Sequence, residues 1–184
     1  DKLSLLAASA TLDRVYDFNE TTFDILIDIL RASTPYVILD VPHVWTSWSR
    51  RLLIGADDVV IVAEPDLANL RNVKSMIDTL RVARPNDSRP KLVMNSVGVL
   101  KRPEIGVAEF AKAVEVEPTS IIANDVKLFG TASNNGQMIA EVESGNPIAT
   151  TFSELGRAVT GRFEVKQTKK NLLDPILARL RRRA

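Results

Sequence analysis

Asp40 is the first residue whose place in the sequence could do chemistry. It directly follows the apolar run from Tyr36 to Leu39, whose lack of alternation predicts a strand covered on both faces of a parallel sheet. The carboxyl ends of such strands form the edge where open parallel sheets bind ligands, and a carboxylate there can hold the water shell of Mg²⁺ beside a phosphate. The alternative is an Asp that stabilises the next loop through its own backbone, and this short signal alone favours that alternative.

Composition excludes several other kinds of site. The 184 residues are 45% hydrophobic and 26% charged, which is typical of a globular domain with a full core. The sequence has no cysteine, which excludes disulfides, thiolate zinc sites and cysteine nucleophiles. Its single histidine, His43, excludes multi-histidine metal sites and leaves little room for a Ser-His-Asp hydrolase. No apolar run is long enough to cross a bilayer, so we expect a cytoplasmic protein.

The elements that must position Asp40 alternate between strands and helices. Apolar runs predict strands at 3–8, 36–40, 59–63, 91–95 and 120–123. Helical periodicity or capping signals predict helices at 19–32 (capped by Asn19 or Thr21), 66–80 (opened by Asp66), 107–114, 134–143 and 151–161. This order predicts an α/β fold, a doubly wound and mostly parallel sheet with helices on both faces.

The C-terminal residues 162–184 carry a separate charge pattern. They contain eight Lys or Arg and two acids, so this tail has a charge of +6 within a total of +1, and residues 1–161 carry about −5. The sequence from Pro175 can form a short helix with an apolar ridge and four arginines near its end. Two interpretations stay open: a solvated end that packs a few leucines on the body, or a segment that contacts a membrane surface or a partner.

Several segments together resemble one family, the MinD/ParA ATPases with a deviant Walker motif, and especially their CpaE/TadZ branch, which serves Flp/Tad pilus assembly. The first is "YVILDVPHVWTSWSRRLLIGADDVVIVAEPDLANLRNVKSMIDTLR". The others are "KLVMNSVG", "RPEIGVAEFAKAV", "KLFGTASNNGQMIAEV" and "ELGRAVTGR", in that branch's order and spacing. "ILDVP" alone is a weak signal, but "EPDLANLRN" joined to "ASNNGQMI" is fairly specific. The resemblance implies a P-loop NTPase fold of the SIMIBI, MinD-like type.

On this resemblance, Asp40 matches the Walker B acid, which binds Mg²⁺ through water. Pro42 lies at the start of switch II and shapes that loop, because it keeps the residue before it extended. We assign no proton transfer to His43, because a lone histidine in a loop is more often a bystander. Trp45 and Trp48 are expected to pack as core or cover; the alternative is an exposed aromatic patch at a dimer or partner surface.

Asn95 matches the family asparagine that hydrogen-bonds the adenine edge, since an amide donates and accepts side by side. The alternative is a turn asparagine that stabilises the bend at "NSVG". Ala123, Asn124 and Asp125 match the other side of the adenine pocket. Ala123 and Val126 stand where relatives usually carry prolines, and we expect this departure to leave the loop less rigid.

One expected motif is absent from these residues. Phosphoryl transfer needs a Gly-rich loop with lysine, and no G-x-x-x-x-G-K-[ST] or lysine-rich variant occurs in the sequence. We therefore expect residues 1–161 to be the C-terminal part of a MinD/ParA-like domain, with the phosphate loop, switch I and a receiver-like domain outside the chain. The resemblance places the phosphate-loop strand between strands 36–40 and 59–63, so those strands would lack a partner, and the chain alone should not hydrolyse ATP.

The resemblance implies a cytoplasmic localisation factor that binds ATP and Mg²⁺, forms a homodimer and recruits pilus or secretion proteins to a pole or to the inner membrane. Peripheral membrane contact would come from the tail at 162–184. The alternative is a scaffold that keeps the fold and the partner surface without turnover. A DNA-binding partition protein is disfavoured because residues 1–161 are acidic. A Rossmann dehydrogenase is weaker still, because no G-x-G-x-x-G follows a strand.

Overall fold

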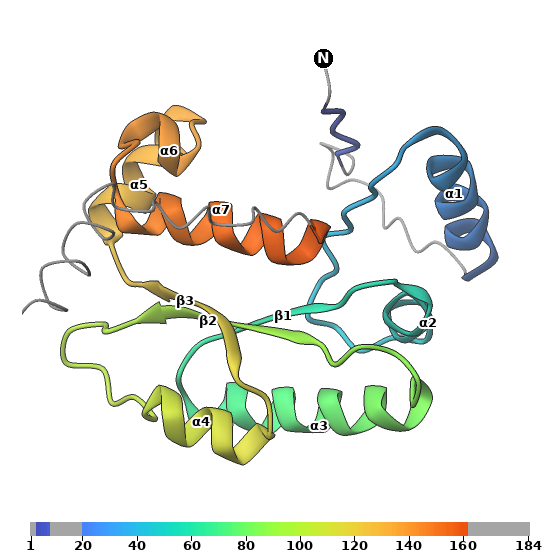
Figure 1. The fold of residues 1–184 in the computed structure, drawn as a ribbon, viewed down its shortest axis with the longest axis horizontal. Helices are drawn as coiled ribbons and strands as arrows, with labels where there is room; N and C mark the ends of the chain where they lie inside the picture. The colour runs from blue at the N-terminus through green and yellow to red at the C-terminus, as the bar shows by residue number, and fades with distance from the viewer. Residues whose placement is uncertain (1–2, 8–19, 162–184) are drawn as a thin grey trace, which may run out of the picture. The chain divides into compact units, whose positions relative to one another are not determined.

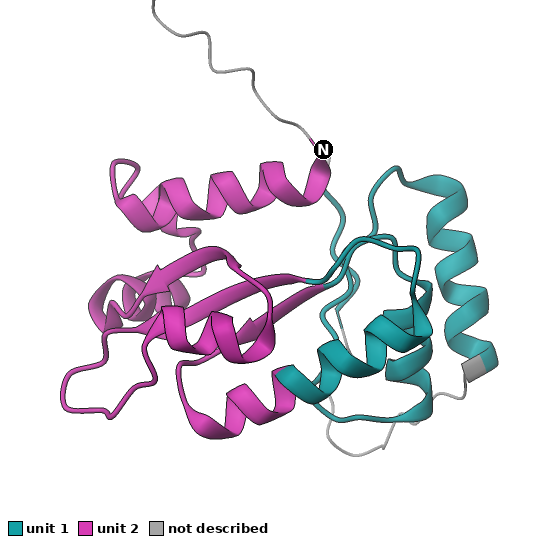
Figure 2. Ribbon diagram, turned by 60° about the horizontal axis from the view of Figure 1, so that its bottom comes forward, with its two compact units in different colours: residues 1–59, 74–90 teal, residues 60–73, 91–184 magenta. Residues whose placement is uncertain are grey.

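The computed structural model describes residues 3–7 and 20–161. The chain divides into two compact units, Asp1–Val59 with Lys74–Pro90 (unit 1) and Val60–Val73 with Lys91–Ala184 (unit 2), as Figure 2 shows. The predictions about the tail at 162–184, including a helix from Pro175, and about Asn19 as a helix cap lie outside the described residues. The division at 161 between domain and tail stays a prediction.

Two of the helices in unit 1 pack through an aromatic pair. Helix α1 (Glu20–Ser33) confirms the helix predicted at 19–32. Helix α2 (Ser47–Gly55) begins with a capping box, in which Thr46 and the buried Ser49 satisfy each other's backbone N–H groups. Phe23 of α1 stacks on Trp48 of α2 with ring centroids 4.5 Å apart. Burial of these rings fixes the pairing of the two helices.

Two predicted strands are wrong in the described residues. Residues 3–7 and 36–40 form no strand, and their apolar side chains are exposed, up to 88% for Ile38 and 89% for Leu5, except for the half-buried Val37. An uninterrupted apolar run becomes a buried strand when neighbouring strands satisfy its backbone N–H and C=O groups. No described segment pairs with either run. The two segments are apolar, as the sequence shows, but the prediction that they pair with other strands is wrong.

Unit 2 is built on a three-stranded parallel sheet in the order β1-β2-β3. The strands are β1 (Val60–Ala63), β2 (Lys91–Val97) and β3 (Pro118–Ala123). They confirm the predicted strands at 59–63, 91–95 and 120–123, and β2 runs two residues further than expected. Leu92, Val93 and Met94 are at most 1% exposed, so the central strand is covered on both faces.

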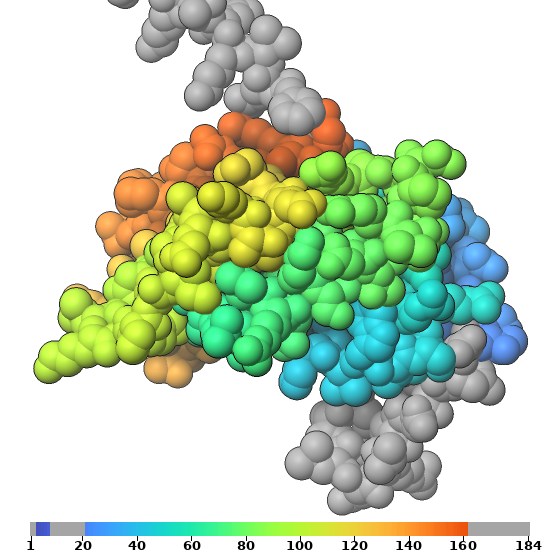
Figure 3. Space-filling view, turned by 90° about the horizontal axis from the view of Figure 1, so that it is seen from below, coloured from blue at the N-terminus to red at the C-terminus, as the bar shows by residue number. Residues whose placement is uncertain are grey.

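Helices cover both faces of this sheet (Figure 1). Helix α7 (Pro147–Thr160) packs against β3 on one face, and α4 (Val107–Val114) lies on the other with the first turns of α3 (Leu67–Ala83). Figure 3 looks at the molecule from the side of α3 and α4, where the yellow-green loop after β2 projects from the surface. The predicted α/β fold with helices on both faces of a parallel sheet is thereby confirmed.

The segment between β3 and α7 differs in detail from the prediction. The helix expected at 134–143 covers only the last two residues of α5 (Val126–Asn135) and the short helix α6 (Ile139–Val142), so most of α5 was not predicted. Gly136 adopts a left-handed backbone with φ 63° and ends α5, because a residue with that φ cannot continue a right-handed helix. The core beneath these helices is formed by Val93, Ile122, Leu128 and Ile148.

Strand β1 is covered on one face. Ile61 and Ala63 are buried, whereas Val60 and Val62 are 37% and 60% exposed. The parallel register places Val62 beside Val93 of β2, on the side of the sheet that carries α7. Among the described residues α7 contacts β3, so the α7 side of β1 remains open.

Candidate functional site

The candidate site lies at the carboxyl edge of the sheet in unit 2, where the three parallel strands end together. Glu64 follows β1, the segment from Asn95 to Val97 ends β2, and Asn124 follows β3. In open α/β sheets this edge is where ligands bind. The edge therefore gathers the residues predicted for the adenine pocket with others that the sequence did not single out.

A β-bulge shapes the end of β2. Met94 pairs with Ile121, and Val97 pairs with Ala123. Between these two pairs β2 has two residues and β3 has one, so β2 contains one extra residue. Ser96, inside the bulge, has a left-handed φ of 52°. A bulge of this kind bends the strand and re-aims its side chains, and bulges are over-represented next to active sites.

Asn95 lies in this bulge and is half-buried. Within the described residues its side-chain amide makes no hydrogen bond. A turn asparagine that stabilises "NSVG" would bond to nearby backbone, and that bond is missing here. The amide therefore keeps its donor and acceptor for a ligand, and its role in adenine binding stays a prediction.

The loop after β3 is joined to this bulge. The backbone N–H of Asn124 donates to the carbonyl of Val97 over 2.8 Å. Asp125 has a structural task, because its Oδ1 accepts the backbone N–H of Leu128 at 2.8 Å and caps α5. Ala123 is exposed, and the half-buried Asn124 side chain has no hydrogen bond within the described residues. The structure thus brings Asn95 and residues 123–125 to one edge.

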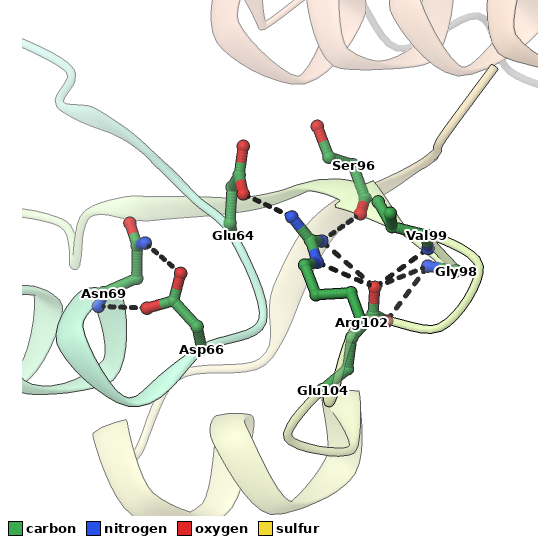
Figure 4. A network of polar contacts seen from close by, with 8 residues as sticks. All are labelled: Glu64, Asp66, Asn69, Ser96, Gly98, Val99, Arg102 and Glu104. Carbon is green, nitrogen blue, oxygen red and sulfur yellow. Dashed lines mark hydrogen bonds and ion pairs between the residues drawn. The ribbon is translucent and has the colours of Figure 1, made fainter. Parts of the chain in front are cut away.

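An ion-pair network supports the loop that follows the bulge (Figure 4). Arg102 donates to Glu64 and to the carbonyl of Ser96, each at 2.5 Å, and to Glu104 at 3.0 Å. The Glu104 carboxylate also accepts the backbone N–H groups of Gly98 at 3.0 Å and Val99 at 2.9 Å. Sequence reasoning missed these three charged residues.

The contacts of the network favour the ionised carboxylate of Glu104. The backbone N–H groups of Gly98 and then Val99, helped by Arg102, lower the pKa of Glu104 against the opposing effect of its partial desolvation. Nearby, Asp66 opens α3 by accepting the backbone N–H of Asn69 at 2.8 Å, and this bond lowers the pKa of Asp66. The predicted cap at Asp66 is therefore confirmed.

A signal for the missed residues exists in the sequence. Glu64 directly follows the apolar run of β1, which is the same pattern that drew attention to Asp40. Arg102 and Glu104 flank a proline in a loop between a strand and a helix, where a charged pair two residues apart can bond to loop backbone. Their partners, however, include the carbonyl of Ser96 and the backbone N–H groups of Gly98 and Val99, which charge patterns do not reveal.

Asp40 and Pro42 lie in unit 1, in the irregular segment before α2, and both are exposed. The expectation that Asp40 ends a strand is wrong, because residues 36–40 form none. Its indirect contact with Mg²⁺ and the switch role of Pro42 stay predictions. The described residues contain no cluster of three or more carboxylate or histidine side chains that could hold a metal ion directly.

The remaining predictions concern the packing of the two tryptophans and the absence of a membrane-spanning segment. Trp48 packs on Phe23, as expected of a covering residue, whereas Trp45 is 47% exposed. Along the described part of the chain, no helix has the length and apolar character needed to span a membrane.

The sequence is similar to that of curated MinD proteins. No family model matches the sequence. The chain is 24% identical over 164 residues to the septum site-determining protein MinD of Bacillus subtilis (strain 168), covering 88% of this chain and 60% of that protein. It is also 24% identical over 157 residues to MinD of Helicobacter pylori, covering 85% of this chain and 57% of that protein. The chain thus spans about 60% of the length of the curated relatives it matches.

Solved structures match the fold. A ParA family ATPase from Chlorobium tepidum TLS superposes with a TM-score of 0.67 at 19% identity, over 83% of this chain and 61% of that one. MinD in the MinC:MinD complex from Aquifex aeolicus gives 0.64 at 17% identity, over 79% of this chain and 61% of that one. Relatives and neighbours together support the MinD/ParA type of P-loop ATPase, and the α/β fold is similar to that of ParA and MinD.

Proposed function

We propose that this chain acts in an ATP-binding localisation and assembly factor of the MinD/ParA type, which serves a Flp/Tad-type pilus or secretion machine. One observation carries the proposal: two half-buried amides, Asn95 and Asn124, stand at the carboxyl edge of a MinD-like sheet without hydrogen bonds within the described residues. Half-buried amides that the protein leaves unpaired are suited to a ligand with adjacent donors and acceptors. The Watson–Crick edge of adenine has both.

The rest of the nucleotide site follows from its charge. A triphosphate needs backbone N–H groups at a helix N-terminus together with lysine, and the sequence has no such Gly-rich loop. ATP turnover under this proposal therefore requires a phosphate loop from outside these residues. Asp40 would hold Mg²⁺ through water, and its exposure leaves it accessible to a hydrated ion.

The proposed partners rest on resemblance. The segments "EPDLANLRN" and "ASNNGQMI", which begin α3 and join α5 to α6, are those most similar to the pilus branch. One structural neighbour is a MinC:MinD complex, and we extend to this chain a protein partner. The ATP-dependent homodimer rests on the family resemblance of the sequence. Contact with the inner membrane would come from the basic tail, and deletion of residues 172–184 should then weaken co-sedimentation with anionic lipid vesicles at low salt.

A scaffold without turnover is the second candidate. It is permitted by the loop "IANDV", in which Ala123 and Val126 stand where relatives usually carry prolines, and it fits the irregular segment that carries Asp40. The two candidates differ in whether ATP is hydrolysed by the whole protein with Mg²⁺, and a phosphate-release assay separates them.

The base site can be tested on the chain itself. In a ¹⁵N-labelled sample we expect adenosine, at millimolar concentration, to shift the side-chain NH₂ signals of Asn95 and Asn124, and guanosine to leave them unchanged. The Asn95→Ala variant should bind adenosine more weakly, so that the Asn124 signal shifts only at higher adenosine concentration. Unchanged signals with adenosine, or equal shifts with guanosine, would refute an adenine site at this edge.

A further inference from the structure

We infer that Arg102 and Glu104 are positioning residues, which hold the bulge of β2 so that Asn95 is presented at the carboxyl edge of the sheet. The inference deepens the proposed function and rests on it for the identity of the ligand. The contacts that carry it belong to unit 2 alone.

The backbone around the bulge needs support from outside itself. Ser96, Gly98 and Lys101 all have left-handed φ values, of 52°, 86° and 62°. Ser96 and Lys101 have a Cβ atom, which makes this conformation unfavourable, so neighbouring contacts must hold it. The bulge residue Ser96 is the direct neighbour of Asn95, and any relaxation there would move the amide.

Arg102 supplies that support from three directions. Its guanidinium binds the carbonyl of Ser96 in the bulge, Glu64 at the end of β1, and Glu104 in its own loop. A second link between the same loop and β1 is the bond from the N–H of Ile105 to the carbonyl of Pro65 at 2.9 Å. The bulge is thus tied to the neighbouring strand and not only to its own turn.

Glu104 orders the two residues that follow the bulge. Its carboxylate accepts the N–H groups of Gly98 and Val99, which face it from consecutive positions of the turn. Such charge-assisted bonds are stronger than those between neutral groups. Arg102 in turn fixes the carboxylate by donating from Nε and Nη2 to the same oxygen. Together, Arg102 and Glu104 bind the backbone of Ser96, Gly98 and Val99.

The geometry requires arginine and not any cation. A planar guanidinium can reach three acceptors in a fixed fork, whereas the single ammonium of lysine cannot do so at once. Arg102→Lys keeps the charge and loses the fork. We expect it to weaken adenosine binding about tenfold, as typical coupling energies between contacting residues allow. The control is Arg51→Ala, which removes an exposed ion pair with Asp24 from unit 1.

A double-mutant cycle separates positioning from general damage. If Arg102 acts through Asn95, then Arg102→Lys should not weaken adenosine binding further in the Asn95→Ala background. An equal loss in both backgrounds would show that Arg102 does not act through Asn95 and would overturn the inference. Circular dichroism of every variant establishes that the comparison is made between folded proteins.

A measurement made without adenosine tests the positioning role of Arg102 and Glu104 separately from the proposed function. Arg102→Lys and Glu104→Gln should speed hydrogen exchange at the amides of Gly98 and Val99 and shift the side-chain signals of Asn95, with Arg51→Ala unchanged. If adenosine fails to bind the wild-type chain while these changes occur, the ligand assignment falls and the positioning pair stands. If exchange and the Asn95 signals are unchanged, the positioning pair is wrong.

Discussion

Replacement of Asp125 gives the sharpest test of how one residue serves both the fold and the predicted site. Asp125 caps α5 through Oδ1, which accepts the N–H of Leu128 at 2.8 Å, and Leu128 is 5% exposed in the core. Asp125→Ala removes the acceptor and leaves a helix N–H unsatisfied. Asp125→Asn keeps an oxygen in the same place, because Asn caps helices about as well as Asp.

The magnitude follows from the cap. Loss of an N-cap side chain costs about 1 kcal/mol of the free energy of unfolding. For a chain of this length that corresponds to a fall of about 3 °C in Tm, or about 0.5 M in the urea midpoint at a typical slope. Asp125→Asn should lose about 0.3 kcal/mol, since it gives up only the interaction of the charge with the helix dipole.

The measurement is urea unfolding followed by circular dichroism at equilibrium, with wild-type protein and both variants in parallel. The matched control is Glu154→Ala, which removes an exposed carboxylate from the interior of α7. Surface changes of that kind stay within about 0.5 kcal/mol. Asp125→Ala as stable as wild type, or Asp125→Asn as unstable as Asp125→Ala, would refute the assignment of a helix cap.

Three further predictions concern single residues. Phe110→Ala, at 0% exposure, should cost about 3–5 kcal/mol in urea unfolding; a loss under about 1 kcal/mol would contradict its place in the core. The pKa of Glu104 is lowered from 4.5 by folding, so its stabilisation is present above that value and is lost as pH falls through its folded pKa. The protection of the Gly98 and Val99 amides, measured against the intrinsic exchange rate at each pH, should fall there, and Glu104→Gln should abolish this pH dependence. Asp40→Ala should abolish Mg²⁺-dependent ATP turnover by the whole protein without a change in circular dichroism, and unchanged turnover would remove the Walker B assignment.

The helices were predictable because their signals are local. Asp66 before an apolar 3–4 repeat predicted the start of α3, and residues 107–114 predicted α4 to the residue. Strand pairing depends on residues far apart in the sequence. The run at 36–40 is apolar, as the sequence shows, but the predicted strand is wrong because no described strand lies beside it. Helix α5 was missed because its sequence carries Gly, Thr, Ser and Asn, and its cap at Asp125 was read as a ligand position.

The sequence predicts where the candidate site lies, but it does not predict the bulge and the ion pairs that hold the site in shape. Asn95 and residues 123–125 follow neighbouring apolar runs, so the topology of a parallel sheet brings them to one edge. The bulge at Ser96 and the contacts of Arg102 depend on a backbone of positive φ at non-glycine residues, for which the sequence has no marker. Such positions are visible once the register of β2 and β3 is known.

The outer edge of β1 is unpaired among the described residues, and its α7 side is open. A short apolar strand with exposed valines and an unpaired edge among the described residues is a template for cross-β aggregation. Acidic residues stand on both sides of it, Asp57 and Asp58 before and Glu64 and Asp66 after. Stacking of such strands in register would bring these like charges together, so we expect the acidic residues to disfavour that stacking. Glu64 anchors Arg102, and on this expectation its charge also opposes stacking of the strand that it follows.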